Sequence, residues 1–175
     1  MVTIHELIGD PAAFIHSVSD GLTKIGIDRA ELALMDHICY RVETRARYLE
    51  LRDALGSLAT LLGESIVANR PIAIYEFTDY PSADGWVVPY LELPAPKEGF
   101  FFPEGLEHAE LVVVGALDRF AHRHADLPFD TRGMDKLLNP ELSYRTSDLA
   151  VKFHEQPLGA VVRAEQRLQR IRSLS

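Results

Sequence analysis

Two related stretches decide the fold: DHICYRV at residues 36–42 and EHAELVVV at residues 107–114. Each begins with an acid followed by a histidine and continues as an apolar run typical of a strand. The two histidines, His37 and His108, are 108 − 37 = 71 positions apart, which leaves room for one supersecondary unit between them. Side chains on a strand alternate between its faces, so two equivalent strands lying side by side would bring both imidazoles together. We therefore expect a repeated module and half of a metal site.

The composition favours a soluble globular protein. The chain has 175 residues, enough for one large domain or two small modules, and 47% of them are hydrophobic. A net charge of −8 argues against a nucleic-acid partner. The single cysteine, Cys39, fits a reducing compartment. We expect a cytoplasmic location without a membrane segment, because no apolar run approaches the roughly 20 residues that span a bilayer and no signal peptide is recognisable.

The pattern of helices and strands repeats along the chain. A first helix is predicted from Asp10-Pro11 to Gly26, since an aspartate cap followed by proline is typical of a helix start. The expected elements after it are a strand at 35–42, a helix at 44–63, a short strand at 65–68, and strands at 72–77 and 86–93. A loop at 94–105, rich in proline and glycine, separates these from a strand after residue 106, a helix at 118–125, strands at 141–145 and 148–154, and a last helix from Pro157.

This order predicts an α+β protein built from two βαβββ modules that form a cupped mixed sheet. One strand of the second module is only weakly signalled. We expect an N-terminal helical extension at residues 1–34, a first module at 35–96, a second module at 97–156 and a C-terminal helix at 157–175. Together these parts would make one compact domain.

The strongest candidate metal ligands are His37, His108 and Glu92. Glu92 interrupts an otherwise apolar strand, where an unpaired carboxylate costs several kcal/mol. Two imidazoles and one carboxylate would leave coordination positions open for substrate or water. The alternatives are hydrogen-bonded histidines in half-buried strands and a glutamate on a solvent-facing edge.

Several further residues are weaker candidates. His154, at the end of the last strand, is a possible fourth ligand or a strand-end histidine in water. Glu110 shares a face with His108 and is a candidate ligand, an acid that orients an imidazole, or a general base. Cys39 shares the face of His37 but is more commonly a small buried hydrophobe. The remaining histidines are expected on the surface, and the cations Arg41, Arg70, Arg145 and Lys152 are candidates for meeting an anionic substrate.

Short motifs spread over residues 36–154 resemble the YecM family. They are Asp36-His37-Ile38 with Arg41, Asn69-Arg70-Pro71-Ile72, Glu92-Leu93-Pro94-x-Pro96, Glu104-Gly105-x-Glu107-His108-x-Glu110, Leu138-Asn139-Pro140-x-Leu142 and Lys152-Phe153-His154. That family is similar in fold to the vicinal-oxygen-chelate superfamily, which includes glyoxalase and bleomycin-resistance proteins. The resemblance implies a cavity with a divalent metal held by His37, Glu92 and His108. Where the superfamily often places a fourth ligand, a glutamate, this chain offers Lys152 and His154.

Two classes of function follow, with a third reading beside them. The first is a metal-dependent isomerase, lyase or oxygenase acting on a small oxygen-rich molecule, with zinc, iron(II), manganese or nickel as the metal and Glu110 as a candidate base. The second is a non-catalytic protein that captures a small ligand in the same cavity. The third is an inert relic of the fold. A monomer and a homodimer are both compatible with the sequence. No phosphate loop, Gly-x-Ser-x-Gly elbow or Cys-x-x-Cys pair is present, so nucleotide-dependent and serine-hydrolase chemistries have no support.

Overall fold

The computed structural model describes residues 2–137 and 139–173. Leu138, part of one family motif, and residues 174 and 175 of the predicted C-terminal segment lie outside this description. None of the helices in the described part of the chain is long and apolar enough to cross a membrane. The N-terminal segment forms α1 (Ile4–Ile8), α2 (Pro11–Lys24) and the 3₁₀ turn η1 (Arg29–Glu31). The predicted helix start at Asp10-Pro11 is confirmed, because the Asp10 side chain accepts a hydrogen bond from the Ala13 amide at 3.0 Å.

The strands of the two expected modules lie in one seven-stranded sheet. The first consists of β1 (Leu32–Arg41), α3 (Arg45–Leu55), β2 (Ala59–Val67), β3 (Arg70–Phe77) and β6 (Tyr90–Pro94), with a small hairpin of β4 (Ser82–Ala83) and β5 (Trp86–Val87) inserted before β6. The second consists of β7 (Gly105–Val113), α4 (Leu117–Arg123), β8 (Glu141–Arg145) and β9 (Ala150–His154). The chain continues into α5 (Leu158–Ser173).

The strand order β2-β3-β6-β1-β7-β9-β8 makes the sheet mixed and open. Within the modules β1 pairs with β6, and β7 pairs with β9, in parallel. The two modules join through an antiparallel ladder between β1 and β7, in which His37 faces Glu110 and Cys39 faces His108. The α+β prediction is therefore confirmed, and the first strands of the two modules lie side by side as expected.

The helix predicted at residues 44–63 is shorter than expected. Helix α3 ends at Leu55, and β2 begins at Ala59, well before the short strand predicted at 65–68. The leucines at 58 and 62 continue the helical spacing in sequence, but this segment pairs with β3 from Ala59 to Val67. The ladder overrides the local periodicity, because tertiary pairing outweighs weak helix propensity.

The second module lacks a full counterpart of β2. Between α4 and β8 the chain makes one isolated bridge, in which Asp130 and Ser143 exchange backbone hydrogen bonds of 2.8 and 3.0 Å. This bridge lies on the outer side of β8, where β2 lies relative to β3 in the first module. The expected strand is therefore reduced to a single pair of residues.

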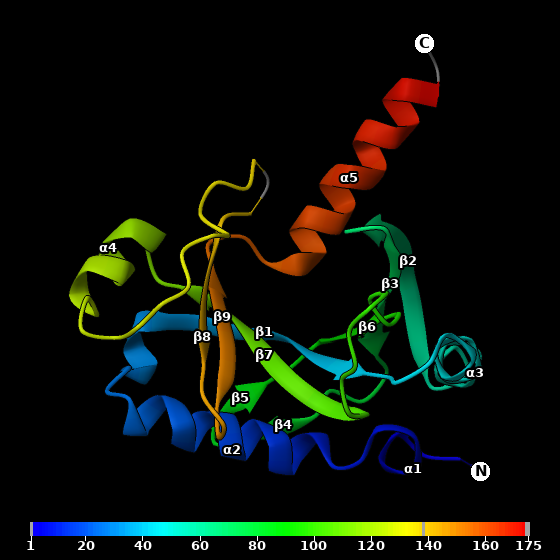
Figure 1. The fold of residues 1–175 in the computed structure, drawn as a ribbon, viewed down its shortest axis with the longest axis horizontal. Helices are drawn as coiled ribbons and strands as arrows, with labels where there is room; N and C mark the ends of the chain where they lie inside the picture. Colours follow the sequence, from blue (N-terminus) through cyan, green and yellow to red (C-terminus); the bar gives the residue numbers. More distant parts are fainter. Residues whose placement is uncertain (1, 138, 174–175) are drawn as a thin grey trace.

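The sheet is curved, and its two faces differ in chemistry. Figure 1 shows α2, α3 and α4 outside the curve and α5 rising from its open side. Because side chains alternate along each strand, the convex face of the central strands carries apolar residues packed into the core: Ile38, Leu91, Ala109, Leu111, Val151 and Phe153. The opposite positions on the same strands carry the polar residues singled out from the sequence: His37, Glu92, His108, Glu110, Lys152 and His154.

Candidate metal centre

The centre lies on the concave face, where four neighbouring strands each contribute at least one polar side chain. The register brings them together, because Cys39 pairs with Glu92 across β1 and β6, and Glu110 pairs with Lys152 across β7 and β9. The three histidines of the centre, at positions 37, 108 and 154, are 1–2% exposed. They are thus placed by the sheet itself rather than by loops.

Two acid–histidine pairs orient the imidazoles of the first and second modules. Asp36 Oδ2 lies 3.1 Å from His37 Nδ1, and the Glu107 carboxylate contacts His108 Nδ1 in the same way. A carboxylate at Nδ1 holds the proton there and turns Nε2 toward the centre, as in many metal-bound histidines. A bulge between Met35 and His37 inserts Asp36 into β1 as an extra residue, which explains how adjacent residues of a strand can contact each other.

Glu110 stands at the middle of the centre. Its Oε1 atom lies 3.5 Å from His37 Nε2, 3.2 Å from His108 Nε2 and 2.6 Å from Lys152 Nζ. Its Oε2 atom lies 3.6 Å from His154 Nε2. One carboxylate therefore contacts three imidazoles and an ammonium group.

Opposite charges control the ionisation of these buried groups. Burial alone would raise the pKa of Glu110, but Lys152 and His37 lower it well below its usual range. Burial alone would lower the pKa of His37, yet Glu110 and Asp36 raise it well above the ordinary value. His154 differs, because burial outweighs the attraction of Glu110 and lowers its pKa. The centre thus contains an ionised carboxylate beside a neutral imidazole at His154.

Three overlapping groups of side chains could hold a metal ion, since the ligand atoms within each group lie within 4.8 Å of one another. They are Asp36 with His37 and His154, Cys39 with Glu92 and His108, and His37 with Glu92 and Glu110. Among the described residues, His37 Nε2 and both ring nitrogens of His154 are buried without a hydrogen-bond partner. Buried polar atoms are normally satisfied, so these nitrogens fit a site for a cation. The donor set of imidazole and carboxylate fits a divalent metal.

The predicted ligands lie close together but not in a single group. Glu92 belongs to two of the groups, one with His37 and one with His108, whereas His154 belongs to the third. Cys39 Sγ lies 3.8 Å from Glu92 Oε1, and burial raises the pKa of its thiol. The orienting roles of Asp36 and Glu107 went unrecognised in the sequence, although the repeated acid–histidine order was a visible signal for them.

Lys152 occupies the place that module equivalence assigns to a second copy of Glu92. Glu92 pairs with Cys39, Lys152 pairs with Glu110, and Cys39 and Glu110 are 110 − 39 = 71 positions apart, the same offset as the two histidines. Burial alone would lower the pKa of Lys152, but Glu110 and Glu92 raise it. An ammonium group therefore stands where a carboxylate equivalent to Glu92 would complete the symmetry.

The other histidines lie away from the centre. His16 Nδ1 contacts Asp84 Oδ2 at 2.7 Å on the surface, and the side chain of His5 is 62% exposed. His124 is more covered than a solvated helix face would be, with 12% of its side chain exposed, because its Nε2 contacts Glu31 at 2.9 Å. None of the three belongs to a metal-binding group among the described residues.

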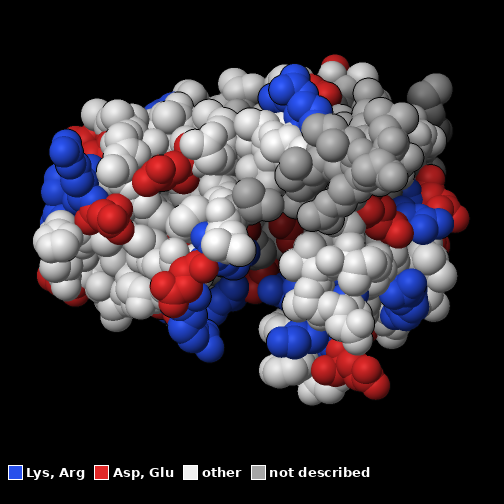
Figure 2. Space-filling model, turned by 90° about the horizontal axis from the view of Figure 1, so that it is seen from above, with Lys and Arg blue, Asp and Glu red and all other residues white. Residues whose placement is uncertain are grey.

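A cavity of about 360 Å³ opens onto the centre. His37, Glu92, Glu110 and Lys152 line one part of it. The β2–β3 hairpin, the segment that leads into β8 and the first turns of α5 line the rest. Figure 2 looks onto this side of the molecule and shows acidic side chains inside a hollow whose rim carries basic ones. The cavity therefore gives a small molecule access to the polar cluster.

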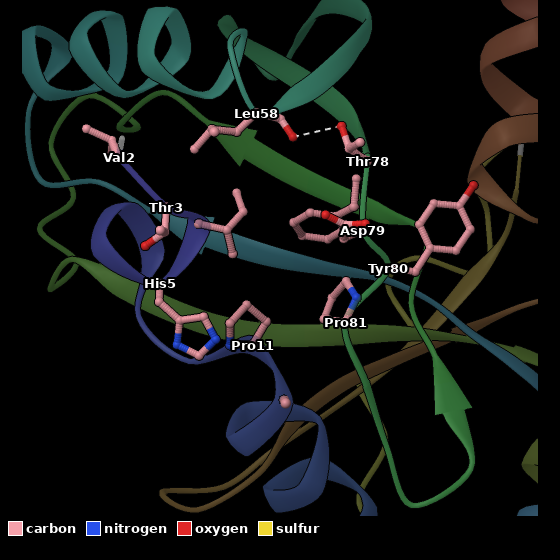
Figure 3. A pocket seen from close by; sticks show the side chains of 12 residues that line it. Val2, Thr3, His5, Pro11, Leu58, Thr78, Asp79, Tyr80 and Pro81 are labelled. Atoms are coloured by element: carbon pink, nitrogen blue, oxygen red, sulfur yellow. Dashed lines mark hydrogen bonds between the residues drawn. The ribbon is translucent and has the colours of Figure 1, made fainter.

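A second cavity, of about 490 Å³, lies between α1 and the segment after β3 (Figure 3). Its lining is largely apolar, and its polar side chains bond locally: Thr78 Oγ1 donates to the Leu58 carbonyl at 2.9 Å. No metal-binding group among the described residues lies in it. We therefore place the candidate site at the concave face of the sheet.

Comparison with known proteins identifies related chains. The model of the family described as YecM protein matches residues 3–132. Protein YecM of Escherichia coli (strain K12) is 26% identical over 178 residues, covering 93% of this chain and 94% of that protein. The solved structure of a structural-genomics protein, EC4020, has a TM-score of 0.72 and 26% identity, with 87% of both chains covered. A hypothetical protein of Bacillus halodurans C-125, BH1468, has a TM-score of 0.49 and 16% identity over 70% of this chain and 93% of its own.

Proposed function

The chain belongs to the YecM family, and from its concave-face cluster we propose that it is a divalent-metal-binding protein of the vicinal-oxygen-chelate type. The observation that carries the proposal is His37 Nε2, a buried ring nitrogen without a hydrogen-bond partner, beside the carboxylates of Glu92 and Glu110. A metal bound there would replace the ring proton that Glu110 and Asp36 favour, since the neutral imidazole is the commonest protein ligand for transition metals. These three residues also line the cavity, so a metal held there would be open to a small molecule.

The proposed ligands are His37, Glu92 and His108, with His154 as the fourth. Each of the first two histidines has its Nδ1 held by an acid, and His154 has two free ring nitrogens among the described residues. Two or three imidazoles with one carboxylate suit zinc, iron(II), manganese or nickel, and ligand type alone does not choose among them.

The proposed activity is isomerase, lyase or oxygenase chemistry on a small oxygen-rich molecule. A bound metal would supply a Lewis acid that polarises a substrate oxygen. Glu110 lines the cavity and is the candidate base. Because Lys152 and His37 lower its pKa, Glu110 would take a proton only from a strongly acidified group. The apolar side chains of β3 and α5 would keep water from the reacting oxygen.

The alternative is a non-catalytic protein that binds a small ligand in the same cavity. Lys152 favours this alternative, since its ammonium group stands in place of a carboxylate equivalent to Glu92 and already neutralises Glu110 at 2.6 Å. A small-molecule partner, a cytoplasmic location and a monomeric or homodimeric state remain predictions from the sequence.

Metal analysis tests the proposal directly. We expect about one equivalent of divalent metal in protein purified without a histidine tag, measured by mass spectrometry after loading with zinc, manganese, nickel or anaerobic iron(II). His37→Ala and His108→Ala should each lose this metal while keeping the far-UV circular dichroism spectrum. The matched control is His122→Ala, on the exposed side of α4, which should retain it. Absence of metal from the loaded wild-type protein would contradict the proposal.

A further inference from the structure

Arg70 is placed at the cavity by a tight turn. It begins β3 directly after the two-residue turn Ala68-Asn69, whose φ angles are 48° and 63°. Two positive φ values are typical of the tight type I′ hairpin turn. Val67 and Arg70 close this turn as a cross-strand pair, and both line the cavity. The guanidinium group is therefore carried by well-ordered sheet rather than by a long loop.

The guanidinium of Arg70 has few protein partners. Its Nη1 donates to the Ala95 carbonyl at 3.1 Å, whereas its Nε is buried without a hydrogen-bond partner among the described residues. A guanidinium has five N–H donors, so most of its capacity is unused. None of the described carboxylates lies within 4.0 Å of it, the distance that defines an ion pair. Arg41 nearby adds like-charge repulsion but has its own partner, Glu107, at 2.8 Å.

The other two cations of the cavity differ in this respect. Lys136 Nζ lies 2.7 Å from Glu141, and Lys152 Nζ lies 2.6 Å from Glu110. Among the described residues that line the cavity, Arg70 is thus the cation without a carboxylate of its own. Glu92 and Glu107 attract Arg70 from beyond ion-pair distance, but burial still lowers the pKa of the guanidinium. A half-buried cation without a direct ion-pair partner is costly, and an anion bound in contact with it removes that cost.

The surroundings of Arg70 restrict the kind of anion. The cavity that Arg70 lines has, besides its polar cluster, apolar side chains from β3 and from the first turns of α5: Ile72, Ile74, Leu158, Val161 and Val162. A fully hydrated inorganic anion would leave this surface uncovered, whereas an organic acid would cover it. The volume of about 360 Å³ admits a small molecule.

We propose that Arg70 binds the carboxylate of a small organic acid whose apolar body lies against β3 and α5. The planar guanidinium matches a carboxylate through two parallel hydrogen bonds, a fit that a lysine cannot reproduce. A second oxygen of the ligand, at the end away from the carboxylate, would reach toward Glu92 and the metal. This part of the inference rests on the proposed function. The contact with Arg70 itself needs no metal.

Calorimetric titration tests the site with three defined probes: 4-methyl-2-oxopentanoate, 2-oxobutanoate and 3-methylbutanoate. We expect saturable binding of 4-methyl-2-oxopentanoate to both metal-free and zinc-loaded protein. Arg70→Gln should weaken it by about tenfold or more in both forms, because a charge-assisted pair is lost. Lys136→Gln is the matched control, a cavity cation already paired with Glu141, and should change the affinity by less than about threefold.

Three outcomes would overturn the inference: no saturable binding of any of the three acids to the wild-type protein, equal binding by Arg70→Gln, or an equal loss in Lys136→Gln. Metal content measured on the same samples separates this inference from the proposed function. If the protein bound the acid but took up no metal on loading, the Arg70 site would stand and the metal proposal would be contradicted. If the protein took up metal but bound none of the acids, the metal proposal would stand and the Arg70 site would be contradicted.

Discussion

Lys152 gives the centre a charge balance that its module symmetry does not predict. Its ammonium nitrogen lies 2.6 Å from Glu110 Oε1, next to the nitrogens proposed to bind metal. Two unit charges about 4 Å apart interact by about 4 kcal/mol at the effective dielectric of a protein surface, and a divalent ion doubles the effect. Lys152 therefore opposes the binding of a metal at Glu110 and supports the binding of anions.

Replacing Lys152 by glutamine should strengthen metal binding. We expect Lys152→Gln to bind zinc about tenfold more tightly or better, equivalent to about 1.4 kcal/mol, because the repulsion disappears and the negative charge of Glu110 is no longer neutralised. Competition with a chromophoric chelator measures the affinity. Lys136→Gln should leave it nearly unchanged, since Lys136 pairs with Glu141 instead. Unchanged or weaker zinc binding by Lys152→Gln would show that the ammonium group does not oppose the metal.

At the same scale, the sequence identified most of the polar residues of the centre but not their arrangement. The repeated acid–histidine order and the lone glutamate in an apolar strand pointed to His37, His108 and Glu92. Glu110 lies in the middle of the centre because the register of the β1–β7 ladder pairs it with His37. The role of Asp36 depends on a bulge, which local sequence pattern did not indicate.

At the scale of elements, an ion cluster joins the 3₁₀ turn η1 to the end of α4. Glu31 accepts hydrogen bonds from Arg123 Nε at 2.7 Å and from His124 Nε2 at 2.9 Å. Burial alone would raise the pKa of Glu31, but these two partners lower it. A carboxyl whose pKa is lower in the folded state stabilises the fold at pH values above its unfolded-state pKa. This contribution disappears as the pH falls through its folded-state pKa.

Glu31→Gln should therefore destabilise the protein in a pH-dependent way. At pH 7 we expect a loss of about 0.5–1 kcal/mol, or about 1–4 °C in Tm, from thermal unfolding followed by circular dichroism. At pH 3, below the ordinary glutamate pKa of 4.5, the difference from wild type should shrink to less than half. Glu50→Gln, whose side chain is 70% exposed, should have little effect at either pH. A difference that persists at pH 3 would show that the charge of Glu31 is not its cause.

Element types were predictable where the periodicity was unambiguous. The strands β1, β7 and β9 and the start of α2 agree with their sequence patterns. The boundary between α3 and β2 was wrong, because leucines at helical spacing also suit a strand that pairs with β3. The expected strand of the second module is reduced to the pairing of Asp130 with Ser143 at the edge of β8.

At the scale of the whole molecule, the β1–β7 ladder makes the two modules one structure. A continuous core runs from Ile15 in α2 through Met35 and Leu111 to Phe120 and Phe153. We therefore expect the modules at residues 35–96 and 97–156 to be repeats in sequence that do not fold independently. Small domains with a shared core usually unfold in a single step.

Cooperative unfolding can be tested with the single tryptophan, Trp86, which lies in the first module under the Arg29 guanidinium at 3.5 Å. In denaturant, Trp86 fluorescence and far-UV circular dichroism should give the same midpoint. Phe120→Ala, in the second module, should lower both midpoints equally, because truncating a buried phenylalanine costs about 3–5 kcal/mol. Phe101→Ala is the control and should leave both midpoints nearly unchanged, because Phe101 is 79% exposed. A Trp86 transition unaffected by Phe120→Ala would mean that the modules unfold separately.

The sequence by itself determined the repeated α+β order and which residues of each strand share a face, because alternation is a local property of the backbone. It also pointed to the residues of the polar cluster. The tertiary structure decided the rest: Glu110 in the middle of the histidines, Lys152 in the place of a second Glu92, and Arg70 at the cavity without a carboxylate partner. These features depend on strand order and register, which are set by contacts between residues far apart in the chain.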